Sequence, residues 1–249
     1  MTQRPVRPYQ FDMQDNEFRT GVIRPIECYR EGWEAIKPHY WLIFVITIVG
    51  IVIGAFSLYI LLGPMVCGIF YCYFRALDGK DVSIEHLFRG FRYLWPSFFV
   101  TALIIVPVVV LFSLIYVPLL LATISGAVMT EEELWAMLTG TILIEFIVAI
   151  VMVCLHTLIM FSFPLIVDRD LSAWNSVTVS ARAVWQNLKG VTGLWAASFV
   201  ATIIGYLAFC VGVYFVVPVM LAANVAAYRK VFPKLPPKRI EPPDPEAYL

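Results

Sequence analysis

The stretch WAASFVATIIGYLAFCVGVYFVVPVMLAANVAAYR, residues 195–229, has a spacing that recurs elsewhere in the chain. Trp195 lies 23 residues before Pro218, and Arg229 follows 11 residues after that proline. The same spacing occurs 154 residues earlier without a gap, at Trp41, Pro64 and Arg75. Part of it occurs a third time, at Trp95 and Pro118. The pattern predicts an internal repeat in which a tryptophan marks the entry to each apolar segment.

The composition indicates a membrane protein. Of the 249 residues, 60% are hydrophobic and only 14% are charged, whereas globular domains are about 25% charged. The formal net charge is zero, and acidic residues are interspersed among the basic ones. We therefore expect membrane lipids, and no nucleic acid, among the partners of this protein.

The positions of the positive charges predict the topology. All 18 Lys and Arg residues fall into four segments, which are 4–37, 75–92, 169–189 and 229–239. The positive-inside rule assigns these segments to the cytoplasmic side, so each apolar block between them crosses the membrane an even number of times. Two crossings per block give six transmembrane helices as three hairpin-like repeats, with both termini cytoplasmic. We expect an all-α, multi-pass protein of a bacterial inner membrane.

The middle apolar block contains an acidic stretch that predicts the start of a helix. Thr130 and Glu133 have the spacing of a capping box, so a fourth helix is expected to begin there and to continue to about Pro164. Residues 125–134 then form the one sizeable outer loop. In an alternative interpretation, residues 93–130 form a hairpin of their own and the glutamates lie inside.

Amphipathic segments precede the apolar blocks. Asp-x-Ser sequences are expected to start helices at residues 83–94 and 172–188, which would lie in the cytoplasmic interface, as would residues 27–38. At 3.6 residues per turn, the aromatic side chains expected to turn inward are Phe88, Phe91, Trp174 and Trp185. The tryptophans expected to anchor the protein at the interface are Trp41, Trp95, Trp174, Trp185 and Trp195.

The chain divides into three parts. Residues 1–24 are predicted to be a cytoplasmic arm, residues 25–231 the transmembrane domain, and residues 232–249 a Pro-rich cytoplasmic tail. Neither arm nor tail has enough apolar residues to order itself, so each is expected to pack on a partner chain or on the interfacial helices. The expected anchors of these two segments are Tyr9, Phe11, Phe18 and Tyr248.

A family resemblance rests on Gly, Pro and small apolar positions. Gly63-Pro64, residues 75–83 and 87–91, residues 164–168 and 172–180, and residues 218–229 carry it. In these positions the chain resembles bacterial six-span membrane proteins of unknown function. That group is distantly similar to the membrane region of some glycerophosphodiester phosphodiesterases. The resemblance implies a six-span fold and assigns no catalytic residue.

Three polar residues within the apolar segments are candidate functional groups. Glu145 and His156 are 11 residues apart, which places both on one face of a helix but roughly 16 Å apart along it. They are interpreted either as parts of a proton or cation path or, for Glu145, as a neutral carboxyl hydrogen-bonded to a neighbouring helix. Asn224 is interpreted as a hydrogen-bonding contact between helices.

No pattern in the sequence predicts enzymatic chemistry. The three histidines lie far apart, the cysteines form no CxxC pair, and no Ser/His/Asp, Walker or GxGxxG pattern occurs. We therefore expect no enzyme activity, no metal and no cofactor. The leading hypothesis is a structural or accessory subunit that contacts lipids and a partner protein or a second copy of itself. The rival hypothesis is a small transporter or lipid-handling protein.

Overall fold

A computed structural model describes residues 18–124, 130–208 and 211–234, and these residues fold into helices joined by short turns, without a strand. In chain order the helices are α1 (Pro25–Ile36), η1 (Lys37–His39), α2 (Tyr40–Phe56), α3 (Leu62–Leu77), η2 (Ile84–Tyr93), α4 (Leu94–Ile124), α5 (Glu131–Leu158), α6 (Ser162–Arg169), α7 (Ala173–Gln186), α8 (Leu188–Leu207) and α9 (Gly212–Val231). The predicted all-helical class is thus confirmed for these residues.

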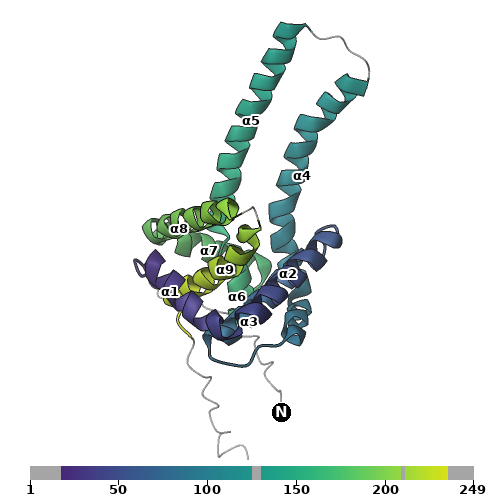
Figure 1. Ribbon diagram of the computed structural model, residues 1–249. Coiled ribbons are helices and arrows are strands. Elements are labelled where there is room, and N and C mark those ends of the chain that lie inside the picture. The colour runs from purple at the N-terminus through teal and green to yellow at the C-terminus, as the bar shows by residue number, and fades with distance from the viewer. Residues whose placement is uncertain (1–17, 125–129, 209–210, 235–249) are drawn as a thin grey trace, which may run out of the picture.

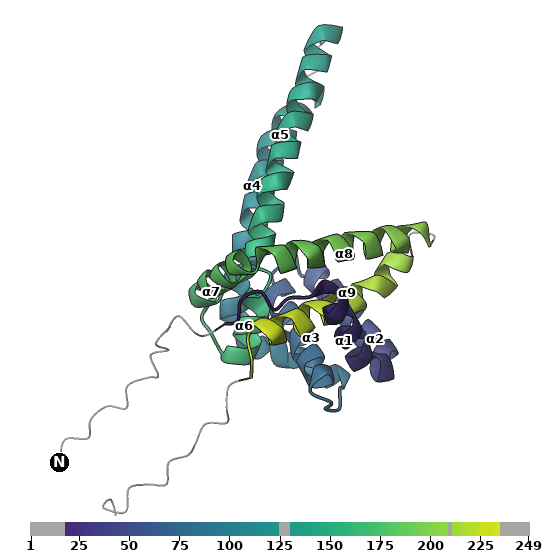
Figure 2. The ribbon, with the colours of Figure 1, turned by 90° about the vertical axis from the view of Figure 1, so that its left-hand side faces the viewer.

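Two parts of the molecule differ in shape. The helices α4 and α5 run side by side and extend far from a body formed by the other helices (Figure 1). Figure 2 shows α8 running across the direction of the α4–α5 hairpin, with α9 returning beneath it. The hairpins therefore leave the body in different directions rather than lying parallel in one bundle.

Five helical stretches of the described residues are long and apolar enough to cross a membrane. They are Pro25–Phe56, Ile84–Pro118, Glu131–Arg169, Leu188–Leu207 and Gly212–Val231. Helix α3 is apolar but has only 16 residues, fewer than the roughly 17 that a spanning helix needs. Membrane-spanning helices are therefore supported by length and composition, whereas the number six is not.

Helix α3 is the centre of the body. Most of its side chains are buried, and it contacts α2, η2, α4, α6 and α9. Gly68 of α3 and Gly90 of η2 allow the closest of these approaches, because a Cβ at Gly68 would lie 1.8 Å from the carbonyl oxygen of Leu87. Gly50 and Gly54 of α2 are both buried, with Ile69 and Leu62 of α3 among their nearest neighbours.

Two surface helices pack on the helix that precedes them in the chain, and the first helix packs on the last. The η2 segment lies on α3, α7 lies on α6, and α1 lies on α9. Small residues make these contacts close: a Cβ on Gly32 would meet the Ala222 backbone at 2.6 Å. Ser180 of α7 accepts a hydrogen bond from the backbone N–H of Phe161 at 3.1 Å. The contact between α1 and α9 joins the two ends of the described chain.

Residues 18–24, in the predicted arm, lie on the body. Phe18 packs against Phe232 with ring centroids 6.0 Å apart, and the backbone N–H of Arg19 donates to the carbonyl of Val231 at 2.8 Å. Asn187 accepts from the Gly21 N–H at 2.7 Å. Phe18, one of the expected anchors of the arm, thus packs on Phe232, the first residue of the predicted tail. The other expected anchors lie outside the described residues: Tyr9, Phe11 and Tyr248.

The middle block begins its second helix where the sequence predicted. The backbone N–H of Glu133 donates to the Thr130 hydroxyl at 3.3 Å, and the Glu133 carboxylate accepts from the Thr130 N–H at 2.9 Å. Helix α5 ends at Leu158 rather than near Pro164, because a turn separates it from α6. Residues 94–124 form one helix, so the alternative hairpin at 93–130 is wrong.

The predicted surface helices exist, but their aromatic side chains do not turn into the protein. In α7 the buried residues are small or aliphatic, such as Ser176, Ser180 and Ala183, which allow α6 to approach closely. Trp174 and Trp185 are on the other side and are 72% and 71% exposed. Phe88 and Phe91 of η2 are also exposed. The inward orientation predicted for these four residues is wrong.

The error in η2 has a geometric cause. This segment is a 3₁₀ helix, which has 3.0 residues per turn rather than 3.6. Residues three apart therefore share a face, and the buried set is Leu87, Gly90 and Tyr93. A second face carries Phe88 and Phe91, whose rings are stacked 6.5 Å apart. The third face carries His86, Arg89 and Arg92.

Candidate functional site

The structure gives Glu145 a partner on the neighbouring helix. The hydroxyl of Tyr116 on α4 donates a short hydrogen bond to the Glu145 carboxyl on α5. This arrangement matches the interpretation of Glu145 as a hydrogen-bonded contact between helices. His156 lies nearer the body, where its Nδ1 is 2.8 Å from the carbonyl oxygen of Met152 in the same helix. Glu145 and His156 therefore contact different groups.

His156 lines a small apolar pocket at the base of the α4–α5 hairpin. The pocket has a volume of about 180 Å³ and is lined by α4, α5 and α7, with Pro107 and Ala181 among its walls. His156 is its only ionisable lining residue. A pocket of this composition can accept an apolar group, but it offers no second polar group for acid–base chemistry.

Asn224 does not make the expected contact between helices. Its side-chain oxygen is buried and accepts no hydrogen bond from the described residues. The residue lines a hollow of about 140 Å³ between α8 and α9, beside Trp195 and Ser198. The hydroxyl of Ser198 instead bonds to that of Tyr29 at 2.7 Å. The sequence correctly placed Asn224 near a neighbouring helix but could not predict which group would lack a partner.

The predicted interfacial tryptophans all lie on the protein surface. The exposed residues are Trp41, Trp95, Trp174, Trp185 and Trp195. Trp41 and Phe44 of α2 also contact Phe215 of α9, with the Phe44 and Phe215 rings stacked 5.0 Å apart. Trp41 and Trp95 stand in the first turns of α2 and α4, and exposed indoles there fit the interfacial positions that Trp prefers in membranes.

A charged cluster joins the ends of three helices. Arg229 of α9 lies 2.7 Å from Asp168 of α6 and 3.8 Å from Asp78, which follows α3. The hydroxyl of Tyr228 donates to Asp168 at 2.8 Å, and Lys234 lies 2.7 Å from Asp78. The Arg229 guanidinium also lies over the Phe74 ring, 4.5 Å from its centroid. Because each acid here has a basic partner, the cluster fastens the helices together.

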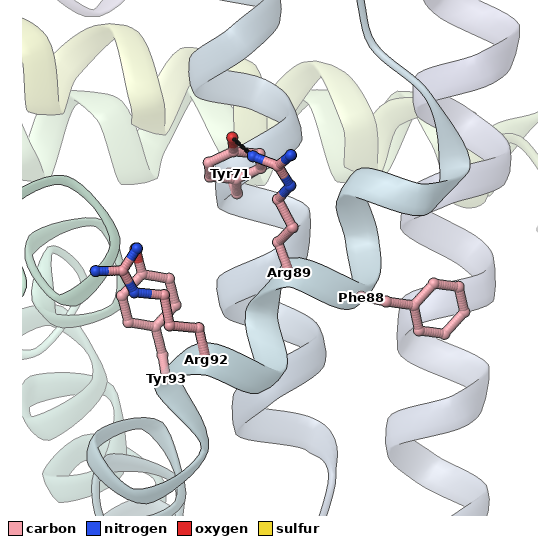
Figure 3. A pocket seen from close by; sticks show the side chains of 5 residues that line it. All are labelled: Tyr71, Phe88, Arg89, Arg92 and Tyr93. Carbon is pink, nitrogen blue, oxygen red and sulfur yellow. Dashed lines mark hydrogen bonds between the residues drawn. The ribbon is translucent and has the colours of Figure 1, made fainter.

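A different set of basic side chains faces an open hollow of about 440 Å³, which we call the arginine hollow. It is lined by Tyr71 of α3 and by Phe88, Arg89, Arg92 and Tyr93 of η2 (Figure 3). Arg89 donates to the Tyr71 hydroxyl at 2.7 Å, and its guanidinium lies 5.5 Å from the ring centroid. Arg92 lies over Tyr93, 5.9 Å from that centroid. Phe88 points away from the arginines in Figure 3.

The arginine hollow was not among the sites predicted from the sequence. Its signal was the spacing of His86, Arg89 and Arg92, because residues three apart are neighbours on a helix and lie on one face in a 3₁₀ helix. The described residues contain no group of three or more side chains that could hold a metal ion. The hollow can instead recognise an anion, because two guanidinium groups and two phenols line it.

Comparison of the chain with protein-family models, curated protein sequences and solved structures finds no match. The resemblance to six-span membrane proteins therefore stays a prediction. The described fold defines a class: an all-helical protein with several apolar helices that could span a membrane.

Proposed function

We propose that this protein is an integral protein of a bacterial inner membrane that acts as a structural or accessory subunit. The α4–α5 hairpin carries the proposal. Its helices have 31 and 28 residues, which correspond to about 46 and 42 Å at 1.5 Å per residue. A hydrocarbon core is about 30 Å thick. The side chains of this hairpin are apolar and exposed along most of its length. Such a surface is expected to face the hydrocarbon of a lipid bilayer.

The proposed arrangement has six apolar membrane helices as three hairpins, of which α4–α5 crosses the membrane, with both termini in the cytoplasm. It is supported by the charge-free apolar blocks of the sequence and by the repeated packing of a surface helix on the helix that precedes it in the chain. The recurring Trp–Pro–Arg spacing supports an internal repeat. The hairpin α4–α5 is the longest of the three, and its tip carries the glutamates that begin α5.

A structural role is favoured by how the polar residues are used. Arg229 and Lys234 neutralise Asp168 and Asp78, and Glu145 bonds to Tyr116. A transporter is expected to gather polar groups near the middle of the membrane. The rival, a lipid-handling protein, is favoured by the arginine hollow and by the apolar pocket beside His156.

Two measurements on the full chain separate these functions. We expect the protein to remain in the membrane pellet after alkaline extraction and to be released by mild detergent as a stoichiometric complex with a partner or as a homo-oligomer, visible by native mass spectrometry. In lipid vesicles it should catalyse neither ion flux nor transbilayer movement of a fluorescent phospholipid. A monomer that moves lipid across the vesicle membrane would replace the proposed function with its rival.

A further inference from the structure

The arginine hollow lies where the chain enters its longest apolar helix. Tyr93, one of its walls, is the last residue of η2, and α4 begins at the next residue. Trp95 follows in the first turn of α4 and is exposed. Tryptophans concentrate at the level of the lipid headgroups. If α4 spans the membrane, the hollow therefore lies at the depth of the headgroups.

The charges of the hollow are available for a ligand. Arg89 has no carboxylate partner among the described residues, and only the phenol of Tyr71 accepts a hydrogen bond from it. Arg92 is 3.6 Å from Asp170, but 73% and 64% of these two side chains are exposed. Such an exposed pair is weak. Each guanidinium retains N–H groups that can donate to an oxyanion.

The faces of η2 match the two halves of a phospholipid. The basic face carries Arg89 and Arg92, while the neighbouring face presents the stacked rings of Phe88 and Phe91. The buried face, with Leu87 and Gly90, fixes the segment on α3. A headgroup phosphate can bind the first face while the start of an acyl chain lies along the second.

We propose that the arginine hollow binds a phosphate group, and that its position assigns this group to an anionic phospholipid rather than to soluble phosphate. Arginine suits this ligand because its planar fork can donate two hydrogen bonds to a phosphate. The volume of about 440 Å³ is within the range of small-molecule pockets. The proposal rests on the proposed membrane location and adds a lipid class and a binding site to it.

The test measures lipid retained by the full chain in nanodiscs of phosphatidylcholine that contain phosphatidylglycerol. We expect Arg89→Gln with Arg92→Gln to weaken phosphatidylglycerol binding about tenfold or more, because charge-assisted hydrogen bonds are lost. The matched control is Arg182→Gln with Lys189→Gln, which removes two positive charges from another exposed surface and should change binding far less. Equal losses in both double variants would overturn the proposal in favour of general electrostatic attraction.

Two further arms make the result specific. Arg89→Lys with Arg92→Lys keeps the charge but not the fork, so its affinity should fall between those of the wild type and the glutamine variant. Full affinity in the lysine variant would contradict recognition by the fork. Binding of inorganic phosphate at the hollow, without a preference for phosphatidylglycerol, would overturn the lipid assignment. Alkaline extraction of every variant separates a failure of the site from a failure of membrane insertion.

The turn between α2 and α3 independently carries a second inference. This turn is apolar and exposed: Phe56 and Leu58 are 86% and 83% exposed, and Ile60 is also exposed. Yet its backbone donors need no water, because each N–H from Ser57 to Leu62 donates within residues 53–62, five to backbone carbonyls and that of Leu61 to the Ser57 hydroxyl. An apolar turn whose donors are internally bonded meets the donor part of the requirement for backbone inside hydrocarbon.

We infer that the α2–α3 turn lies within the hydrocarbon of the bilayer rather than in the water on the far side. The lengths agree with this position, since 17 and 16 residues give helices of only about 26 and 24 Å. The hairpin then enters and leaves by the same face without crossing. This inference also rests on the proposed membrane location.

The position of the turn is measured with Ile60→Cys in a variant of the full chain whose native cysteines are replaced. A membrane-impermeant maleimide should not label Ile60→Cys from either side, whereas a bimane attached there before reconstitution should be quenched by lipids brominated on their acyl chains. Glu132→Cys, on the α4–α5 hairpin, is the positive control for labelling from outside. Labelling of Ile60→Cys from outside would overturn the inference and make α2 and α3 complete spans.

Discussion

Arg229 connects more of the molecule than any other charged residue described. It is 15% exposed and bridges acids from α6 and from the end of α3. Because the Arg229 guanidinium is largely removed from water, replacing it leaves its acidic partners short of a compensating positive charge. The residue therefore stabilises the junction of three helices rather than one local contact.

We expect Arg229→Met to lower the free energy of unfolding by about 3–5 kcal/mol, the range for breaking a buried ion pair. The matched control is Arg92→Met, which removes an exposed partner of Asp170 and should cost less than about 1 kcal/mol. Unfolding in mixed micelles, followed by Trp fluorescence, measures both values. Equal effects would show that the cluster does not fasten the helices.

Gly68 is a second position where one side chain decides the packing. Gly68→Ala would place a methyl group 1.8 Å from the Leu87 carbonyl oxygen, so η2 must move away from α3. We expect a loss of about 3 kcal/mol, at the upper end for overpacking. Gly140→Ala is the control, because nothing lies within 4 Å of the added atom and alanine favours a helix by up to about 1 kcal/mol. Equal free energies of unfolding for both variants would show that Gly68 does not approach η2 this closely.

At the scale of elements, α4 and α5 have few contacts with each other, so the hydrogen bond between them matters. A double-mutant cycle with Tyr116→Phe and Glu145→Leu should give a coupling of about 0.6 kcal/mol and at most about 1.7, as for hydrogen bonds between membrane helices. The stability of the two single variants and the double variant in micelles supplies the cycle. A coupling of zero would show that this hydrogen bond does not stabilise the hairpin.

The same pair tests the ion-path interpretation. Glu145→Gln can still accept the hydrogen bond from Tyr116, so we expect stability and vesicle ion permeability close to those of the wild type. An ion flux in the wild type that Glu145→Gln abolishes, with the fold intact, would establish Glu145 as part of a path. That result would favour the transporter hypothesis over the structural one.

Some elements could be predicted from the sequence because their signals are local. Thr130 and Glu133 specify the start of α5 within four residues, and the Ser172 hydroxyl does the same for α7. The face of η2 could not be predicted, because 3₁₀ geometry here accompanies its close packing on α3 through Gly68 and Gly90. That packing depends on a residue of another helix, so the sequence of η2 alone does not encode it. The arginine hollow was missed because one of its walls, Tyr71, comes from α3 and not from η2.

At the scale of the whole molecule, the recurring spacing predicted where hairpins begin but not how they are arranged. The contact of α1 with α9 joins residues about 190 positions apart, as in the pair of Gly32 with Ala222. Lys230 strengthens this contact by pairing with Glu27 and Glu31, at 3.2 and 3.0 Å. No local pattern encodes such a closure, because it depends on how three hairpins pack around α3.

The central claim is that the α4–α5 hairpin crosses the membrane with its tip outside, while the segments that carry Lys80 and Lys234 lie on the cytoplasmic side. The most direct measurement is labelling of single cysteines in intact cells with a membrane-impermeant maleimide. We predict that Glu132→Cys reacts from outside, whereas Lys80→Cys and Lys234→Cys react only after the membrane is permeabilised. Reaction of Lys80→Cys or Lys234→Cys in intact cells, with Glu132→Cys protected, would contradict the account.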